Sequence, residues 1–363
     1  MSTSETAMPA SPGAEAGASS EATASHGSIV KQFLLDNSPE FKRLAELRQR
    51  GWENQEGDVY FQRQRASADT ASRKNAEFFY GLMQRIGTEM GRATGALKIT
   101  TKPSHHVNIL DTCMAPGGFL AIVMKLNPGA KAVGFSLSPE EGGHEVLLPL
   151  KSKVKFTPAD VTMFAADMGF TDIPAEHPDA QKFVVQRQIH AEQKFDLVVC
   201  DGQVLRTHPR AAYREWETRR LATTQLTMGL DHVVAGGTMV MLLHKLEAWN
   251  TVDLLYTFSK FSSVQTFKSK IGHATRSSFY MVATNIQPQT LQARQAVERW
   301  KKHWKVATFG SNEECQSTFR ETDVAAEQMV AEFGRDLVRL GKGIWEIQAD
   351  ALEKAPFIKP RQA

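Results

Sequence analysis

The stretch "NILDTCMAPGGFLAIVMKLNPGAKAVGFSLSP", residues 108–139, decides the fold. An apolar run ends at Asp111 and a turn follows, after which apolar residues resume at helical spacing and a second strand-like run begins. Gly117 and Gly118 remove side chains where the first run meets the helix, so backbone N–H groups and the helix N-terminus can face a ligand. The alternative is a tight turn that binds nothing, because Gly and Pro are common in all loops.

Strand and helix signals alternate along the chain beyond this stretch. The sequence predicts a long helix over residues 213–234, which Gly236 and Gly237 would end. We therefore expect an α/β fold with a mostly parallel, seven-stranded sheet and helices on both faces. The last two strands should form a C-terminal antiparallel hairpin, which places an antiparallel strand at the edge of the sheet. The predicted strands are residues 107–111, 131–137, 152–160, 194–201, 238–244, 263–270 and 277–286.

Length and composition allow this sheet to be part of a larger globular chain. The 363 residues are 42% hydrophobic and 23% charged, which is ordinary for a soluble protein. We expect a disordered tail over residues 1–28, because this segment is rich in Ala, Ser, Gly and Glu. The remaining prediction is an N-terminal helical extension over 29–95, the α/β domain over 96–286 and a C-terminal helical extension over 287–363.

Charge and cysteine content narrow the class of protein. The net charge of +3 is compatible with a nucleic-acid partner but does not require one. Cys113, Cys200 and Cys315 are too widely spaced for a disulfide framework or a zinc cluster, which predicts no metal and an intracellular location, cytoplasmic or nuclear. No apolar run approaches the roughly 20 residues of a membrane span. Residues 1–28 lack the Lys and Arg of a signal peptide or a mitochondrial presequence.

In open α/β sheets, ligands bind beyond the carboxyl ends of the parallel strands. The residues that follow the predicted strands are therefore the candidates for binding and chemistry. They are residues 111–118, 136–138, 160, 201–203 and 244–247. The sequence lacks a G-x-G-x-x-G dinucleotide motif and the G-K-[ST] of a P-loop, so a turn that cradles phosphate is disfavoured.

Two motifs in this order carry a resemblance to a known family. "DTCMAPGGF" at residues 111–119, followed by "FDLVVCDG" at residues 195–202, resembles the FtsJ-like (ribosomal RNA large subunit methyltransferase E-like) family. The resemblance implies a Rossmann-like methyltransferase fold and S-adenosylmethionine as the cofactor. It also implies RNA as the partner, with methylation of a ribose 2′-hydroxyl as in ribosomal RNA processing or cap formation. It gives no oligomeric state.

The resemblance also implies a set of cofactor contacts. Asp111 and the turn after it would hold the methionine moiety, and Asp160 would contact the adenine amino group. The ribose hydroxyls of the cofactor would contact either the side-chain hydroxyls of Ser136 and Ser138 or the carboxylate of Glu140. Asp201 would lie at the methyl-transfer centre. The residues assigned to the cofactor in this way are Asp111, Ala115, Pro116, Gly117, Gly118, Phe119, Ser136, Asp160 and Asp201.

The catalytic set that the resemblance implies is Lys-Asp-Lys-Glu, and this sequence departs from it. Asp201 is in place, whereas the other three positions carry Gly81, Leu242 and Ser278. A ribose hydroxyl is a poor nucleophile at neutral pH, so a lysine with a lowered pKa would be a suitable base. Lys245 and Glu247, on the loop after the fifth strand, are the candidates to act beside Asp201. Lys245 is three residues past the expected position, a shift that reverses the face of a strand unless the loop redirects the side chain.

Three accounts of function remain open on the sequence alone. In the first, the protein is a methyltransferase that acts on RNA with a remodelled site. In the second, the domain is catalytically degenerate and binds cofactor, RNA or a protein partner. In the third, methyl transfer is redirected to a small molecule. An RNA enzyme should have an open, positive groove beside Asp201, whereas a small-molecule enzyme should have a closed, apolar pocket.

Two basic segments each have two interpretations. The first follows Asp201 and could track phosphates, or could form a solvated helix with local Glu–Arg pairs. Its arginines are Arg206, Arg210, Arg214, Arg219 and Arg220. The second, "VERWKKHWK" at residues 297–305, could stack bases, but the helical spacing of its apolar residues favours a core-facing stripe.

Overall fold

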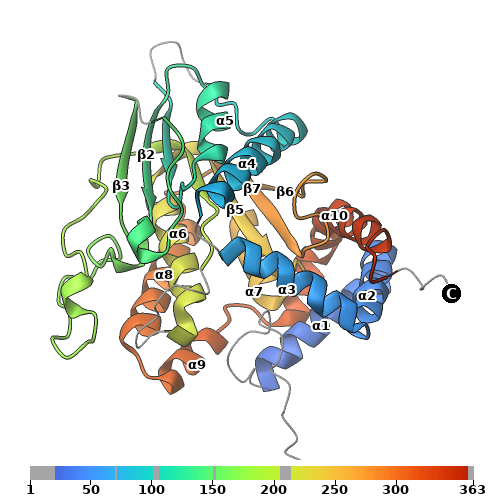
Figure 1. Cartoon of the computed structure of the whole chain (residues 1–363). Helices are drawn as coiled ribbons and strands as arrows, with labels where there is room; N and C mark the ends of the chain where they lie inside the picture. The colour runs from blue at the N-terminus through green and yellow to red at the C-terminus, as the bar shows by residue number, and fades with distance from the viewer. Residues whose placement is uncertain (1–20, 70–71, 101–105, 150–152, 205–213, 359–363) are drawn as a thin grey trace, which may run out of the picture.

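A seven-stranded sheet forms the centre of the computed structural model, which describes residues 21–69, 72–100, 106–149, 153–204 and 214–358 (Figure 1). The strand order is β3-β2-β1-β4-β5-β7-β6. The strands are β1 (Asn108–Asp111), β2 (Lys131–Ser136), β3 (Val154–Pro158), β4 (Phe195–Cys200), β5 (Val233–His244), β6 (Ser263–Phe267) and β7 (Ser278–Ile286).

The first five strands run parallel, so their carboxyl ends meet at one edge of the sheet. Strand β7 pairs antiparallel with both β5 and β6. The expected mostly parallel seven-stranded sheet and its C-terminal antiparallel hairpin are confirmed. The expectation of an antiparallel strand at the edge was wrong, because β7 lies inside the sheet and β6 is the edge. The burial of the two strands agrees with this order, since β7 is buried along most of its length and the first four residues of β6 alternate between exposed and partly buried.

Gly236 and Gly237, which were expected to end a helix, lie within strand β5 instead. The helix α6 (Glu217–His232) ends earlier than predicted, and β5 begins at Val233. Gly236 has φ +81°, and the register between β4 and β5 shifts at this point, as in a β-bulge. A Cβ on Gly237 would lie 2.6 Å from a Val233 methyl group. The glycines therefore allow the bulge rather than end the helix.

Helices cover both faces of the sheet, as predicted. On one face, α4 (Arg73–Thr94) and α5 (Gly118–Leu126) pack their apolar residues against the strands. On the other face, α6 packs with α7 (Trp249–Ser259) and α8 (Leu291–Phe309). Short 3-10 helices connect these layers: η1 (Pro139–Glu141), η2 (Val161–Met163), η3 (Ala180–Lys182) and η4 (Arg214–Trp216).

The apolar stripe of the second basic segment faces the core, which confirms the preferred interpretation. Val297, Trp300 and Trp304 of α8 are buried, and the Trp304 indole donates a hydrogen bond to the carbonyl of Thr162 at 3.0 Å. The lysines between them make surface contacts, such as the Lys302–Glu321 ion pair at 2.6 Å.

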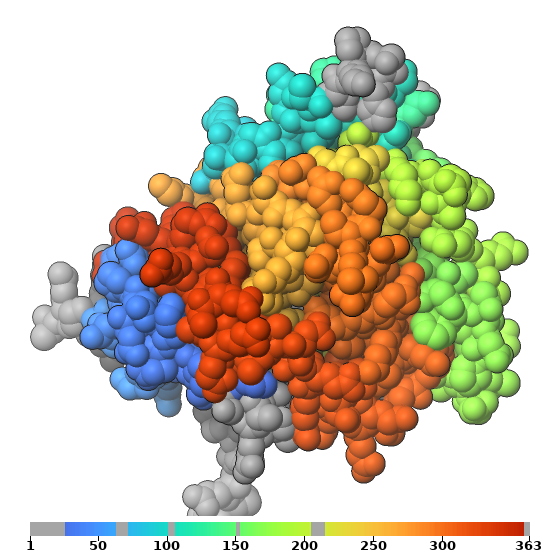
Figure 2. Space-filling view, turned by 180° about the vertical axis from the view of Figure 1, so that it is seen from behind, coloured from blue at the N-terminus to red at the C-terminus, as the bar shows by residue number. Residues whose placement is uncertain are grey.

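The chain ends outside the central domain form a helical layer of their own. Helices α1 (Glu21–Asn37) and α2 (Pro39–Trp52) pack against α10 (Ala326–Glu353), so helices far apart in the sequence lie side by side (Figures 1 and 2). The layer also contains α3 (Gln55–Asp69), while α9 (Asn312–Arg320) packs on α8. The predicted disordered tail was to end at residue 28, but helix α1 continues through this position. His26 contacts the ring of Trp249 and Val30 is buried, so this part of the helix packs on the protein. Residues 1–20 of the predicted tail lie outside the described residues.

The described residues lack two features that would place the protein in other classes. None of the helices there has both the length and the apolar character needed to cross a membrane. No group of three or more His, Cys, Asp or Glu side chains suited to a metal ion occurs in the same part of the chain.

Candidate active site

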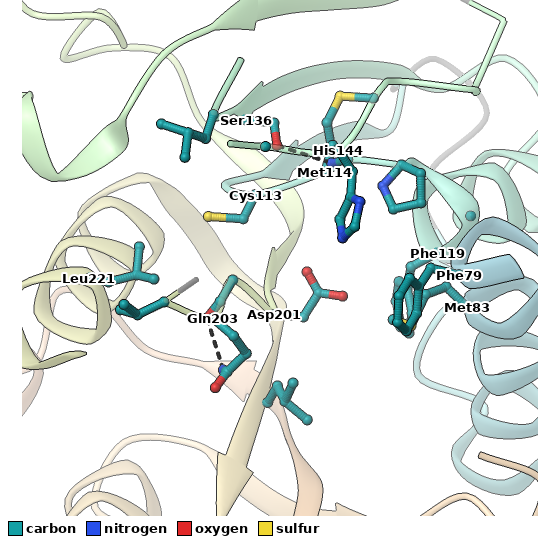
Figure 3. A pocket seen from close by; sticks show the side chains of 18 of the residues that line it. Phe79, Met83, Cys113, Met114, Phe119, Ser136, His144, Asp201, Gln203 and Leu221 are labelled. Atoms are coloured by element: carbon teal, nitrogen blue, oxygen red, sulfur yellow. Dashed lines mark hydrogen bonds between the residues drawn. The ribbon is translucent and has the colours of Figure 1, made fainter. Parts of the chain in front are cut away.

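A cavity of about 400 Å³ opens at the carboxyl ends of the parallel strands. Figure 3 shows the Asp201 carboxylate directed into it, with Phe79 and Phe119 on one side and Leu221 and Gln203 on the other. Eight of the sequence-predicted site residues line it together: Ala115, Pro116, Gly117, Gly118, Phe119, Ser136, Asp160 and Asp201. The structure thus brings together residues from the ends of four strands.

The glycines of the turn after β1 are required by close packing. Gly117 is the N-cap of α5 and has φ +97°, a conformation that favours glycine. A Cβ on Gly118 would lie 2.1 Å from the carbonyl oxygen of Tyr80, so any side chain there would push α4 away. Both glycines also line the cavity, so the turn can be approached closely by a ligand. Both the close packing and the access of a ligand to the turn therefore explain why Gly117 and Gly118 are glycines.

Asp111 lies beneath this turn and does not line the cavity. Its side chain is 1% exposed and accepts a hydrogen bond from the backbone N–H of Cys113 at 3.2 Å. Burial raises the pKa of Asp111 well above its ordinary value, and the charge of Asp201 raises that pKa further. Burial also raises the pKa of Asp201 to about 7. At neutral pH the carboxyl groups of Asp111 and Asp201 are therefore not both fully ionised.

Cofactor candidates at the ends of β2 and β3 are held by short polar contacts. Ser136 Oγ accepts a hydrogen bond from the backbone N–H of Ala115 at 3.3 Å, which ties β2 to the turn. Asp160 accepts bonds from the Thr162 backbone N–H and hydroxyl at 2.9 and 2.7 Å and so caps η2. Both residues line the cavity, whereas Glu140, the other candidate for the ribose contact, does not.

The end of β5 contributes a strand-end candidate to which the sequence interpretation gave no role. His244 lines the cavity, and its Nε2 lies 3.0 Å from Gln203 Oε1. Gln203 Nε2 donates to the Gly202 carbonyl at 2.9 Å, so Gln203 Oε1 is the acceptor and His244 Nε2 carries the hydrogen. Loss of hydration, with a further effect from Arg276, lowers the pKa of His244 to about 4. The ring is therefore neutral, and its Nδ1 is a hydrogen-bond acceptor.

The position of His244 on its strand could have been used as a signal. It lies two residues beyond Leu242, where the family pattern has a lysine, and residues two apart share a face of a strand. Leu242 lines the same cavity, which confirms the shared face. Lys245, three residues beyond Leu242, has φ +46°, is exposed and does not line the cavity.

The other two catalytic candidates separate in the structure. Asp201 lies in the cavity, whereas Glu247 lies outside its lining and binds Arg48 of α2 at 2.5 Å. Ser278 lines the cavity at the position expected for the glutamate, and Gly81 does not. None of the described residues on the cavity wall is a lysine. The structure therefore does not bring Lys245 and Glu247 together with Asp201.

The β6–β7 loop, residues 268–277, forms a further wall of the cavity. It contributes Ser269, Gly272, His273 and Arg276. Lys268, which the sequence interpretation missed, is 4% exposed and donates hydrogen bonds to three carbonyl groups. The acceptors are Arg276 and Ser278 at 2.7 Å and His273 at 3.4 Å. Burial lowers the pKa of Lys268 to about 7, and its position makes it a brace for the loop.

Two arginines of the first basic segment contact protein groups. Arg220 is fully buried and pairs with Glu217, a residue of the cavity wall, at 2.7 Å. The Arg219 guanidinium lies 4.6 Å from the centre of the Phe319 ring. Arg206, Arg210 and the side chain of Arg214 lie outside the described residues. For Arg219 and Arg220 the observed contacts favour the interpretation as a helix with local pairs over one that tracks phosphates.

Comparisons with solved structures give low similarity throughout. An rRNA methylase from Streptococcus thermophilus is 10% identical, with coverage of 50% of this chain and 88% of that chain and a TM-score of 0.30. An O-methyltransferase family protein from Burkholderia thailandensis is 11% identical, with 72% of each chain covered and a TM-score of 0.32. TrmN from Thermus thermophilus is 13% identical, with 55% of this chain and 48% of that chain covered and a TM-score of 0.31. Such scores carry no argument about substrate.

A family model gives the assignment. Among curated proteins, none matches the sequence at a significant level. The model of the FtsJ-like methyltransferase family matches residues 92–286, more than half of the chain. This range contains the strand order described above, the turn after β1 and Asp201. The chain therefore belongs to the FtsJ-like methyltransferase family.

Proposed function

We propose that this methyltransferase transfers a methyl group from S-adenosylmethionine to RNA, with a ribose 2′-hydroxyl as the acceptor. The observation that supports the proposal most is the single cavity that combines the turn after β1 with Asp160 and Asp201. The cavity volume of about 400 Å³ lies within the usual range of small-ligand sites. The family membership supports RNA as the substrate class.

The residues of the cavity fit the chemical groups of the donor. The turn of residues 115–119 places backbone N–H groups and the α5 N-terminus where an amino-acid carboxylate would bind. The Ser136 hydroxyl suits ribose hydroxyls, and Asp160 is an acceptor for an amino group such as that of adenine. Apolar side chains, including Val161 and Leu221, provide the surfaces that a purine ring requires. We call residues 115–119, Ser136 and Asp160 the donor side.

Asp201 and His244 provide the polar groups for the acceptor. The donor supplies an activated methyl group, so the protein has to orient the acceptor hydroxyl and remove its proton. With a pKa of about 7, Asp201 is partly ionised at neutral pH, so its carboxylate can take that proton. His244 Nδ1 stays unprotonated and can accept a hydrogen bond that fixes the position of the acceptor group. In this role Asp201 replaces the missing lysines.

The test is a methyl-transfer assay with S-adenosyl-[methyl-³H]methionine and total RNA, with and without ribonuclease treatment. We expect label in RNA that survives alkaline hydrolysis as dinucleotides, because a 2′-O-methyl group blocks cleavage at that linkage. The matched variant is Asp201→Asn, which keeps the shape of the side chain and should abolish the labelling. Label in alkali-sensitive positions only would contradict the ribose assignment.

A second candidate function has one observation in its favour. Leu242 and Ser278 stand on the cavity wall where the family pattern has a lysine and a glutamate. A catalytically degenerate protein that binds the donor molecule or RNA would have such a wall. In that case the protein would bind S-adenosylmethionine, no RNA pool would be labelled, and Asp201→Asn would leave RNA binding unchanged.

A further inference from the structure

The β6–β7 loop lines the cavity, and β4 and β5 separate its strands from β1 in the sheet. We therefore assign the loop to the part of the cavity left for the methyl acceptor. Two of its residues, His273 and Arg276, line the cavity and carry nitrogen groups that can form hydrogen bonds. The loop contains no helix or strand, so its conformation depends on the contacts that hold it. This assignment of the loop to the acceptor rests on the proposed function, whereas the contacts described next do not.

The first set of contacts comes from within the domain. Lys268 donates to carbonyl groups at the far end of the loop, as described above. Glu89 of α4 accepts hydrogen bonds from the Ser269 hydroxyl at 2.6 Å and from the Lys270 backbone N–H at 3.1 Å. These contacts hold both ends of the loop, whereas the carbonyl of Thr275 is bound by another partner.

The second set of contacts comes from the helical extensions. Gln348 of α10 is 4% exposed, and its Nε2 donates to the carbonyl of Thr275 at 3.1 Å. Its Oε1 accepts from Arg48 Nη2 of α2 at 2.8 Å. The same guanidinium binds Glu247 through Nη1 at 2.5 Å, with side-chain exposures of only 15% and 13%. The Gln348 amide is therefore fixed in one orientation, because one end accepts and the other donates.

We propose that α2 and α10, which lie outside the part of the chain matched by the family model, set the acceptor wall of the cavity through Arg48, Gln348 and Thr275. Gln348 and Arg48 are positioning residues, since they reach the cavity only through the loop. A glutamine suits this place because it can accept from Arg48 and donate to a carbonyl at once. A carboxylate of the same length would keep the Arg48 contact and lose the bond to Thr275.

Hydrogen–deuterium exchange of the full chain tests this relay without knowledge of the substrate. We expect Gln348→Met and Gln348→Glu to accelerate amide exchange in the β6–β7 loop by ~10-fold, since a buried hydrogen bond to the loop is lost. The control is Asp350→Ala, which breaks the Arg43–Asp350 ion pair between the same two helices and touches no loop residue. Exchange in the loop that stays at the wild-type rate in both Gln348 variants, or that rises equally in the control, would overturn the proposal.

Binding and kinetics separate this proposal from the proposed function. In the two Gln348 variants, the Kd of S-adenosylhomocysteine should stay within about 2-fold of wild type, because the donor side is untouched. The KM for labelled total RNA should rise, with kcat little changed, if the loop presents the acceptor. A wild-type protein that labels no RNA counts against the proposed function, whereas the exchange experiment still decides the relay. A change of donor affinity as large as the change in loop exchange would contradict a role confined to the acceptor wall.

Discussion

The donor side and the β6–β7 loop are held in opposite ways, although both line one cavity. The donor side is built from consecutive residues after β1 and from the ends of neighbouring strands, so its shape follows from the sheet itself. The β6–β7 loop is held by side chains from α4, α2 and α10, which are distant in sequence. The first region keeps the motif of the family, and the second directly precedes Ser278, where the family pattern has a glutamate. We therefore expect mutations to separate binding of the donor from recognition of the acceptor.

The strongest test of this separation is Asp201→Asn. We expect methyl transfer to fall by ~100-fold or more, because the group that takes the proton is removed. Donor affinity should change little, since the donor side is intact. The measurement is the labelling assay beside calorimetry with S-adenosylhomocysteine. Equal losses of affinity and of rate would show that Asp201 serves the donor instead.

The donor side should be most sensitive at Gly118. Gly118→Ala places a Cβ against the Tyr80 carbonyl, so we expect a loss of about 2–3 kcal/mol in the free energy of unfolding together with weaker donor binding. Gly81→Ala, on an open face of α4, is the matched control and should be neutral or stabilising. Chemical denaturation checks both values. A Gly118→Ala protein as stable as wild type would contradict the packing described for the turn.

The pKa of Asp201 predicts how stability depends on pH. Its folded pKa of about 7 lies above the ordinary value of 3.8, so this carboxyl group favours folding when protonated. That contribution is complete below pH 4 and is lost as the pH rises through about 7. Asp201→Asn should therefore gain stability relative to wild type between pH 5 and pH 8, by roughly 2 kcal/mol. Denaturation curves of both proteins at pH 5 and pH 8 give this difference in the free energy of unfolding. A difference that is the same at both pH values would refute the raised pKa.

The same titration predicts the pH profile of the reaction. The rate of methyl transfer should rise with pH through about 7, as Asp201 loses its proton. His244 is neutral over this range, so it should not add a second step. Single-turnover labelling between pH 5.5 and 8.5 gives the profile. A rate independent of pH would exclude Asp201 as the proton acceptor.

The smallest effects distinguish His244 from Lys245. His244→Ala should reduce methyl transfer by ~10-fold, because a hydrogen bond to the acceptor is lost. Lys245→Ala should stay within about 2-fold of wild type, since this exposed residue does not line the cavity. The two residues are adjacent, so each is a control for the other in the labelling assay. The reverse order of effects would support the lysine that the sequence suggested.

The sheet and the donor side could be predicted because their signals are local. Apolar runs and glycine turns are properties of neighbouring residues, and they predicted the seven strands. The positions that follow these strands, together with the family motifs, predicted the eight residues that line the cavity. The rest depends on contacts between distant segments. The bulge at Gly236 depends on the pairing with β4, and the position of α1 at residue 26 depends on a contact with Trp249. Likewise, nothing near Gln348 in the sequence indicates a contact with Thr275.

The catalytic residues fall between these cases. Asp201 was predicted because it directly follows a strand of the family motif. His244 was among the strand-end candidates but received no role, because a lysine was expected there, although the even spacing from Leu242 was visible in the sequence. Lys245 and Glu247 are close to the right place along the chain, but the backbone turns after His244 and Glu247 meets Arg48 instead. The direction of a side chain just beyond a strand therefore depends on the path of the backbone and on contacts with distant segments.

Titration calorimetry of the full chain with S-adenosylmethionine and S-adenosylhomocysteine tests the central claim most directly. Wild type should bind both ligands with a Kd of about 1–100 μM. Asp160→Ala, on the donor side, should weaken binding at least ~10-fold, while Gln348→Met should not. Absence of binding to either ligand by the folded wild-type protein would contradict the assignment of the cavity and leave the domain without its proposed donor.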